Sequence, residues 1–135
     1  GSFSAGEHND CVAMAKQFAD RTHFVHLRSC YIFPNGNFTE ASHLGGRGHL
    51  IELCRIFEKA EHEGKCNSGR RLPMRVDHGM TFTDEPGGVF DESNHGHNAG
   101  YTLLGRMFAM GQIQGVLATV DDELGIEYKQ PGFYD

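Results

Sequence analysis

Side chains that can bind a metal or move a proton follow two short apolar segments of this sequence. His26 and Arg28 lie in the stretch "THFVHLRS", and Asp77 and His78 follow the apolar residues of "LPMRVDHG". A neutral imidazole and a carboxylate are ligands for Mn²⁺, Fe²⁺ or Zn²⁺, and histidine also transfers protons near neutral pH. The structural alternative is that His26 belongs to the core and that Asp77 caps the following segment.

Other polar side chains are candidates for substrate binding or proton transfer. Arg28 and Arg75 can each offer a fork of donors to a substrate carboxylate. His43, in "FTEASHLGG", is a third candidate for substrate binding. Tyr101, in "NAGYTLLGR", has a hydroxyl that can donate to an oxyanion or pass a proton. As plain structure, Tyr101 would be an aromatic residue at a helix start that packs on the loop.

Three more polar residues carry weaker signals. Glu40 shares its block with His43, and its role is open between the site and a solvated surface charge. His95 and His97 form the "HGH" pair in a glycine-rich stretch, where solvent exposure is the expected state.

The spacing of apolar residues predicts the elements that position these groups. Residues 34–48 and 79–99 are rich in Gly, Asn and Ser and are predicted as loops. A further short helix over 117–124 is left open. The predicted elements are a helix over 10–20, a strand over 23–33, a helix over 48–63, a strand over 72–78, a helix over 101–114 and a C-terminal arm over 115–135.

Strands that alternate with helices indicate an α/β fold with parallel strands and right-handed crossovers. In such folds the chemistry lies at the C-terminal ends of the strands. His26, Arg28, Asp77 and His78 all occupy that position. The whole chain, residues 1–135, is predicted to be one structural segment with its chemistry at one edge of the sheet.

Composition narrows the function classes. The formal net charge of −6, with 12 basic against 18 acidic residues, argues against nucleic-acid binding. No apolar run approaches the roughly 18 residues of a membrane span, and no signal-peptide pattern is present, so a cytoplasmic protein without a membrane partner is predicted. The four cysteines, Cys11, Cys30, Cys54 and Cys66, have no CxxC spacing. Because Cys11 and Cys54 fall on the apolar faces of predicted helices, buried free thiols are expected and not a disulfide framework.

Five blocks in order resemble the C-terminal part of D-mannonate dehydratase, an enzyme family of hexuronate catabolism. The blocks are "GSFSAGEHND", "HFVHLRS", "NFTEASHLGG", "PMRVDHG" and "AGYTLLGRMFAMG". The resemblance implies a partial (β/α)₈ TIM barrel of the xylose-isomerase-like superfamily, built from C-terminal βα units. It also implies the removal of water from D-mannonate to give 2-keto-3-deoxy-D-gluconate.

The resemblance assigns roles to individual residues. His26 and Asp77 correspond to ligands of a divalent metal, usually Mn²⁺, with Fe²⁺ or another divalent ion as alternatives. His78 and Tyr101 correspond to catalytic residues, and which of them is the acid and which the base is open. A cysteine and a further histidine that also bind the metal in the family have no counterpart in this sequence.

At most three βα units cannot close an eight-stranded barrel. The chain is therefore expected to need a missing N-terminal barrel half, or self-association into a homo-oligomer, and to be inactive alone. Two other functions stay open: a non-catalytic remnant that binds a metal or a sugar acid, and a sugar isomerase or epimerase on the same barrel.

Overall fold

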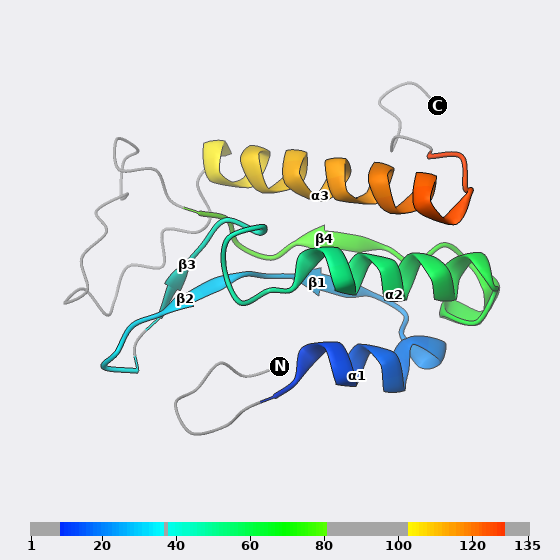
Figure 1. Ribbon diagram of the computed structural model, residues 1–135, viewed down its shortest axis with the longest axis horizontal. Coiled ribbons are helices and arrows are strands. Elements are labelled where there is room, and N and C mark those ends of the chain that lie inside the picture. Colours follow the sequence, from blue (N-terminus) through cyan, green and yellow to red (C-terminus); the bar gives the residue numbers. More distant parts are fainter. Residues whose placement is uncertain (1–8, 37, 81–102, 129–135) are drawn as a thin grey trace.

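The computed structural model describes residues 9–36, 38–80 and 103–128. The chain alternates helices and short strands, with two single turns of 3₁₀ helix (Figure 1). In order, the elements are α1 (Cys11–Phe18), η1 (Ala19–Arg21), β1 (Val25–Leu27), β2 (Cys30–Ile32), β3 (Phe38–Glu40), α2 (Leu50–His62), η2 (Asn67–Gly69), β4 (Met74–Val76) and α3 (Leu103–Leu124).

Strands β1 and β4 form a parallel pair at the centre of the molecule (Figure 1). Val25 pairs with Met74, His26 with Arg75, and Leu27 with Val76. This pairing confirms the α/β class and the parallel strands that the sequence predicts. Strands β2 and β3 form a separate antiparallel pair just beyond the C-terminal end of β1.

Three helices run alongside the parallel pair, with α2 in contact with both α1 and α3 (Figure 1). One face of the strands packs against these helices through the buried side chains of Val25, Leu27 and Val76. Because strand residues alternate between the two faces, the residues between them point away from the helices. The hydrophobic core therefore lies on one side of the sheet, and the polar side chains of the strands lie on the other.

The local sequence explains where α1 and α2 begin and end. Asp10 caps α1 by accepting a hydrogen bond from the backbone N–H of Ala13 at 2.9 Å. Helix α2 buries residues at helical spacing, including Cys54 and Phe57, and lies within the predicted 48–63. It ends before Gly64, whose φ of 67° is the left-handed conformation that glycine adopts at helix ends.

The predicted strand over 23–33 is interrupted in the structure. It forms two three-residue strands, β1 and β2, that belong to different sheets. The break falls at Ser29, whose carbonyl accepts a hydrogen bond from Ala41 N–H at 2.9 Å and whose hydroxyl accepts one from Gly48 N–H at 3.3 Å. The predicted loop over 34–48 correspondingly contains β3, which is the partner of β2.

The C-terminal part also differs from the prediction. One continuous helix, α3, covers Leu103–Leu124, where the sequence predicts a helix ending at 114 and an arm from 115. Continuous burial of Ala109, Ile113, Val116 and Val120 holds the helix together across the predicted break. Tyr101, residues 81–99 of the loop predicted over 79–99, and the end of the predicted arm from 129 lie outside the described residues.

The structure can be compared with two expectations from the sequence, the state of the cysteines and the lack of a membrane-spanning segment. All four cysteines are free thiols; Cys30, Cys54 and Cys66 are buried, and Cys11 is intermediate. Of the helices in the described part of the chain, none combines the length and the apolar character that a membrane crossing requires.

Candidate functional site

The face of the sheet that points away from the helices carries the candidate metal ligands. His26 lies in the middle of β1, beside Arg75 of β4, and Asp77 directly follows β4. The Nδ1 atom of His26 is 3.9 Å from Oδ1 of Asp77. The ring of Phe24 packs edge-on against the His26 imidazole, with 4.9 Å between ring centres. An imidazole and a carboxylate from two neighbouring strands therefore meet on one open surface.

The donor set of His26 and Asp77 suits a divalent transition metal. Two atoms that bind the same metal ion, each at about 2.0–2.2 Å, can lie 3.9 Å apart, as Nδ1 of His26 and Oδ1 of Asp77 do. Both side chains keep contact with solvent, with 47% of the His26 side chain and 23% of the Asp77 side chain exposed. Among the described residues, no group of three or more His, Cys, Asp or Glu side chains is arranged to hold a metal. The described part of the chain thus brings together two candidate ligands, His26 and Asp77.

His78 turns back toward the site at the end of β4. Its backbone has a φ of 61°, in the left-handed region that histidine adopts more often than most residues. Its Nε2 atom lies 3.8 Å from Oδ1 of Asp77, and its side chain is only 8% exposed. Strict strand alternation would have sent His78 to the opposite face from Asp77. The left-handed residue ends that alternation and brings both side chains together.

The glycine that follows His78 is required by close packing against α3. A Cβ atom added to Gly79 would lie 2.6 Å from the backbone oxygen of Gly105 and 2.7 Å from its carbonyl carbon. Two glycines therefore let the end of β4 and the first turn of α3 touch backbone to backbone. This contact fixes the turn that carries Asp77 and His78.

A partly buried ion pair borders the site. Arg28 donates from Nε to both carboxylate oxygens of Glu40, at 3.1 and 3.2 Å, and its Nη2 also contacts Oε1. The hydrogen bonds to Glu40 raise the pKa of Arg28 above its usual value, in spite of partial burial. The Nδ1 atom of His78 lies 3.6 Å from Glu40 Oε1. A continuous row of polar side chains therefore runs from Arg28 through Glu40 to His78 and Asp77.

Of the predicted substrate-binding residues, Arg75 alone lies on the open face of the sheet. It pairs in register with His26 and is exposed. The donors of Arg28 are directed at Glu40 instead. His43 is buried, with 2% exposure, and its Nε2 lies 2.8 Å from the carbonyl oxygen of Leu27. Since a carbonyl only accepts, Nε2 carries the hydrogen of that bond, and the contact holds the ring beneath the end of β1.

Glu40 is the residue of this cluster whose role the sequence left open. Its side chain is 6% exposed, and it points inward from the last position of β3. Its pairing with Cys30 in the β2–β3 register puts it beside Arg28. Hydropathy gives no signal for an inward-pointing carboxylate. The one available clue is its position in a block that also contains His43.

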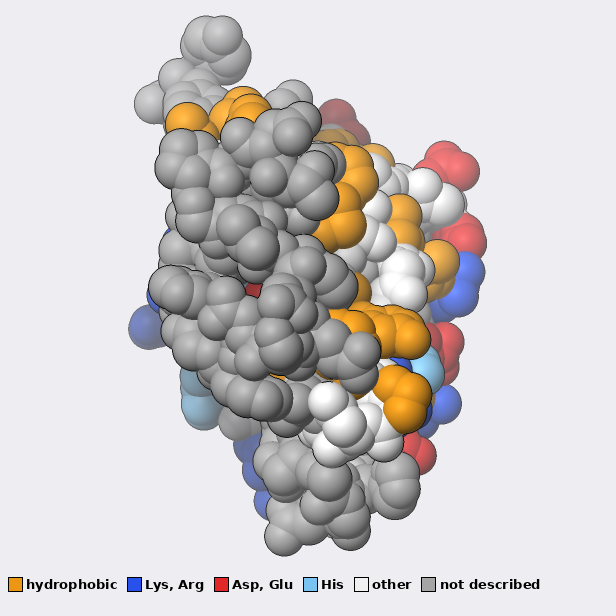
Figure 2. All heavy atoms as spheres, turned by 90° about the vertical axis from the view of Figure 1, so that its left-hand side faces the viewer, with side chains coloured by type: hydrophobic (Ala, Val, Ile, Leu, Met, Phe, Trp, Pro, Cys, Tyr) orange, Lys and Arg blue, Asp and Glu red, His pale blue; other side chains and the backbone are white. Residues whose placement is uncertain are grey.

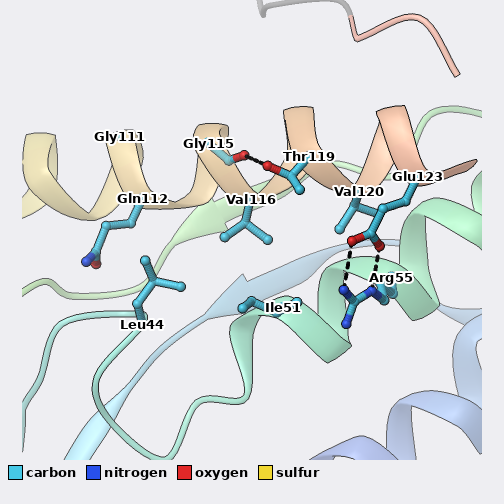
Figure 3. A pocket seen from close by; sticks show the side chains of 10 residues that line it. All are labelled: Leu44, Ile51, Arg55, Gly111, Gln112, Gly115, Val116, Thr119, Val120 and Glu123. Atoms are coloured by element: carbon cyan, nitrogen blue, oxygen red, sulfur yellow. Dashed lines mark hydrogen bonds and ion pairs between the residues drawn. The ribbon is translucent and has the colours of Figure 1, made fainter. Parts of the chain in front are cut away.

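A groove of about 460 Å³ between α2 and α3 is separate from this cluster (Figure 3). Its lining is mostly apolar and includes two of the three glycines of α3, Gly111 and Gly115. The ion pair of Arg55 and Glu123 closes one end, with Nε–Oε2 and Nη2–Oε1 distances of 2.8 and 2.9 Å. The groove contains none of the predicted site residues. We therefore place the chemistry at the strand ends, where the ionisable groups converge.

Comparison with known proteins identifies relatives for most of the chain. The family model of D-mannonate dehydratase (UxuA) matches residues 1–126. The chain is 36% identical to mannonate dehydratase 2 of Agrobacterium fabrum over 126 residues, which are 92% of this chain and 30% of that protein. It is 34% identical to mannonate dehydratase of Saccharophagus degradans over 123 residues, 90% of this chain and 30% of the relative. The chain thus spans about 30% of the length of these curated relatives.

Proposed function

This chain belongs to the D-mannonate dehydratase family, and from that premise we propose that it forms part of the active site of a metal-dependent hydro-lyase. The reaction removes water from D-mannonate and gives 2-keto-3-deoxy-D-gluconate. One observation carries the proposal: His26 of β1 faces Asp77, which directly follows the adjacent parallel strand β4, near the C-terminal edge of the pair. In α/β folds this edge is where substrates bind and react.

We infer that the parallel pair is part of a (β/α)₈ barrel. Helices α1, α2 and α3 pack on one face of β1 and β4, as the outer helices of a barrel do. The opposite face carries polar and charged side chains, as the cup of such a barrel does at its C-terminal end. The short β2–β3 hairpin then belongs to a loop at the rim of that cup.

The reaction needs two proton transfers next to the substrate carboxylate. The C2 proton leaves as a proton, the C3 hydroxyl leaves as water, and the resulting enol tautomerises to the 2-keto acid. A divalent cation held by His26 and Asp77, Mn²⁺ by preference or Fe²⁺, would stabilise negative charge that develops on the substrate oxygens. His78 and Tyr101 are the residues that we propose for the proton transfers, without a division of acid and base between them.

The position of His78 suits proton transfer. Its ring is mostly buried and lies between the carboxylates of Asp77 and Glu40. Such a ring has one restricted orientation, which is what a proton donor or acceptor needs at a fixed substrate atom. Arg75, beside His26 on the open face, is the cation that we propose for the substrate carboxylate.

Further polypeptide is a part of this proposal. The first half of α3 exposes large apolar side chains, among them Leu103 at 74%, Leu104 at 57% and Met107 at 59%. Figure 2 shows apolar side chains on the surface of the molecule seen from the end where α3 begins. A helix that is apolar on all sides is normally covered by other protein. We propose that the rest of a barrel, or a second copy of this chain, covers this surface and supplies the remaining metal ligands.

Complementation tests the proposed activity. The chain is mixed with the separately expressed segment of the Agrobacterium fabrum relative that lies outside the matched region. The complex is supplied with Mn²⁺, and formation of a 2-keto acid is followed with semicarbazide. We expect turnover of D-mannonate, no turnover of its C2 epimer, and no turnover with the Asp77→Asn variant.

A folded, Mn²⁺-loaded complex that binds D-mannonate without turning it over would favour a non-catalytic sugar-acid-binding module. Turnover of D-mannonate to an epimer or isomer, with no 2-keto acid formed, would contradict the dehydratase and favour the isomerase alternative. Asp77→Asn separates the site from contamination by an endogenous enzyme, because it changes one ligand and keeps the side-chain size.

A further inference from the structure

Glu40 is a carboxylate whose burial must be compensated. The side chain is 6% exposed, at the end of a three-residue strand. An ionised carboxylate in such a position is stable only when it is paired and hydrogen-bonded. Arg28 provides this compensation through Nε, which donates to both oxygens, and through Nη2, which contacts Oε1. The pair is thus built into the β2–β3 rim and is not a surface contact.

The guanidinium of Arg28 is held from a second direction as well. Its central carbon lies 5.3 Å from the centre of the Phe38 ring, in a cation–π contact. Phe38 and Glu40 lie two residues apart in β3, and the Arg28 guanidinium contacts both the Phe38 ring and the Glu40 carboxylate. An arginine in this position has its planar fork of donors already engaged. A substrate carboxylate would have to displace Glu40 to use it.

Glu40 also faces His78. Its Oε1 atom lies 3.6 Å from Nδ1 of His78, while the other ring nitrogen, Nε2, lies 3.8 Å from Asp77 Oδ1. The imidazole therefore lies between two carboxylates that approach its two nitrogens from different elements. The backbone of His78 is in the left-handed region, which costs energy and persists where surrounding contacts hold it.

We propose that Glu40 is a positioning residue of this site: with Arg28 as its fixed counter-charge, it holds the His78 imidazole in the orientation for proton transfer. In this arrangement Arg28 serves Glu40 and not the substrate carboxylate. The inference rests on the proposed function, because the proton-transfer role of His78 comes from it. Loss of a residue that orients a group in direct contact with the reaction commonly lowers activity about 10–100-fold.

The placement of Glu40 is tested on the chain itself, without turnover. Glu40→Gln removes the charge and keeps the side-chain size. The matched control is Glu123→Gln, because Glu123 also forms a two-bond pair with an arginine, Arg55, but is 43% exposed and lies in the groove between α2 and α3. NMR with ¹⁵N-labelled histidine and arginine, at one fixed pH, reports the side-chain nitrogens of His78 and Arg28.

We expect Glu40→Gln to shift the side-chain signals of both His78 and Arg28 and to leave those of His43, which is bound to the Leu27 carbonyl, in place. Glu123→Gln is expected to change neither His78 nor Arg28. Unchanged His78 and Arg28 signals in Glu40→Gln would overturn the proposal. If Glu40→Gln does not fold, Glu40→Asp, which keeps the charge and withdraws it by one methylene, is judged by the same signals.

The role in the reaction is tested in the complemented, Mn²⁺-loaded complex. We expect Glu40→Gln to lower kcat about 10–100-fold, with KM and bound Mn²⁺ within about twofold of the unchanged complex. Glu40→Asp is expected to recover part of kcat. A raised KM or a loss of Mn²⁺ with unchanged kcat would overturn the positioning role. Absence of turnover in the unchanged complex would refute the proposed function, and the NMR experiment would still decide where Glu40 acts.

Discussion

Nδ1 of His26 and Oδ1 of Asp77 lie 3.9 Å apart, although the two residues come from different βα units of the chain. Parallel pairing of β1 with β4 brings them together, because their C-terminal ends meet at one edge. Period-two alternation then points His26, Arg75 and Asp77 away from the helices. The convergence follows from strand direction and register.

Loss of either proposed ligand, His26 or Asp77, is expected to weaken metal binding. In the complemented complex, His26→Ala and Asp77→Ala should each lower the affinity for Mn²⁺ by at least about tenfold, which is the lower end of what the loss of a supporting residue produces. His78→Ala should keep the metal and slow turnover. The measurement is bound Mn²⁺ after desalting, together with titration of free Mn²⁺ by EPR.

His23→Ala is the matched control for metal binding. His23 is exposed and its Nδ1 lies 3.0 Å from Asn67 Oδ1, near the start of β1 and away from the site. Its removal should leave Mn²⁺ binding unchanged. Equal loss of metal in His78→Ala and Asp77→Ala would show that the roles assigned to these two neighbours are wrong.

The sequence was sufficient for the features that depend on regular periodicity. The buried face of α2, the presence of a strand within the predicted 72–78 and the parallel pairing all follow from spacing of apolar residues and from the order of elements. The facing of His26 and Asp77 follows as well, because the side of a strand is fixed by counting residues. To predict these features, it is enough to know in which direction the neighbouring strand runs.

Features set by tertiary contacts were not predictable from spacing. Residues on both sides of Ser29 favour strands, so nothing local marks the change of partner from β4 to β3. The helix predicted to end at 114 continues past Gly115 in the structure: a glycine costs a helix only about 1 kcal/mol, and burial of Ile113, Val116 and Val120 outweighs that cost. Glu40 points inward because it pairs with Arg28, and Arg28 lies in the connection between β1 and β2.

Gly79→Ala is expected to destabilise the fold. The added methyl group would meet the backbone of Gly105 at 2.6 Å, and a helix backbone cannot move aside as a side chain can. Such overpacking costs about 1–3 kcal/mol. Urea unfolding followed by circular dichroism gives the free energy of unfolding. In the complex, the same variant should also slow turnover, because it displaces the turn that carries His78.

Gly111→Ala is the matched control for this substitution. Gly111 lies in the same helix as Gly105, and a Cβ atom added there meets nothing within 4 Å. Alanine is the better helix former by up to about 1 kcal/mol, so this variant should be as stable as the parent or more stable. Equal destabilisation by both substitutions would show that the Gly79–Gly105 contact is not the cause.

The four cysteines should react with thiol reagents at very different rates. Burial raises the pKa of Cys30 and of Cys54 to about 12, and burial also raises that of Cys66. Because the thiolate is the reactive form, these three should be almost inert in the folded chain near pH 8. Cys11 is less buried and should react first with Ellman's reagent.

Cys11→Ser should remove the fast phase of that reaction, and urea should expose the remaining three thiols. Fast labelling of three or four thiols in the native chain would contradict the packing of α2 and of the β1–β2 connection.

The contact between α2 and α3 contains an acidic cluster away from the site. Burial, followed by the negative charges of Asp121 and Glu61, raises the pKa of Glu58 to about 7, while Arg71 acts in the opposite direction. Asp121 is itself 7% exposed, and Tyr128 lies close enough for Glu58 and Asp121 to raise its pKa further. Two carboxylates this close favour a proton on one of them.

The stability of the chain should therefore fall as pH rises through this range. The folded pKa of Glu58 lies above its ordinary value of 4.5, so the native state holds the extra proton between these two values. The stabilisation is complete below about pH 4.5 and is lost as pH rises through about 7. We expect a loss of about 1–2 kcal/mol, because solvent screening at a partly open carboxyl reduces the full linkage value. Urea unfolding at about pH 5 and about pH 8 measures it.

Glu58→Gln, which cannot ionise, should flatten this dependence, whereas Glu52→Gln, on the exposed side of the same helix, should keep it. A slope that survives unchanged in Glu58→Gln would assign the pH dependence to other groups.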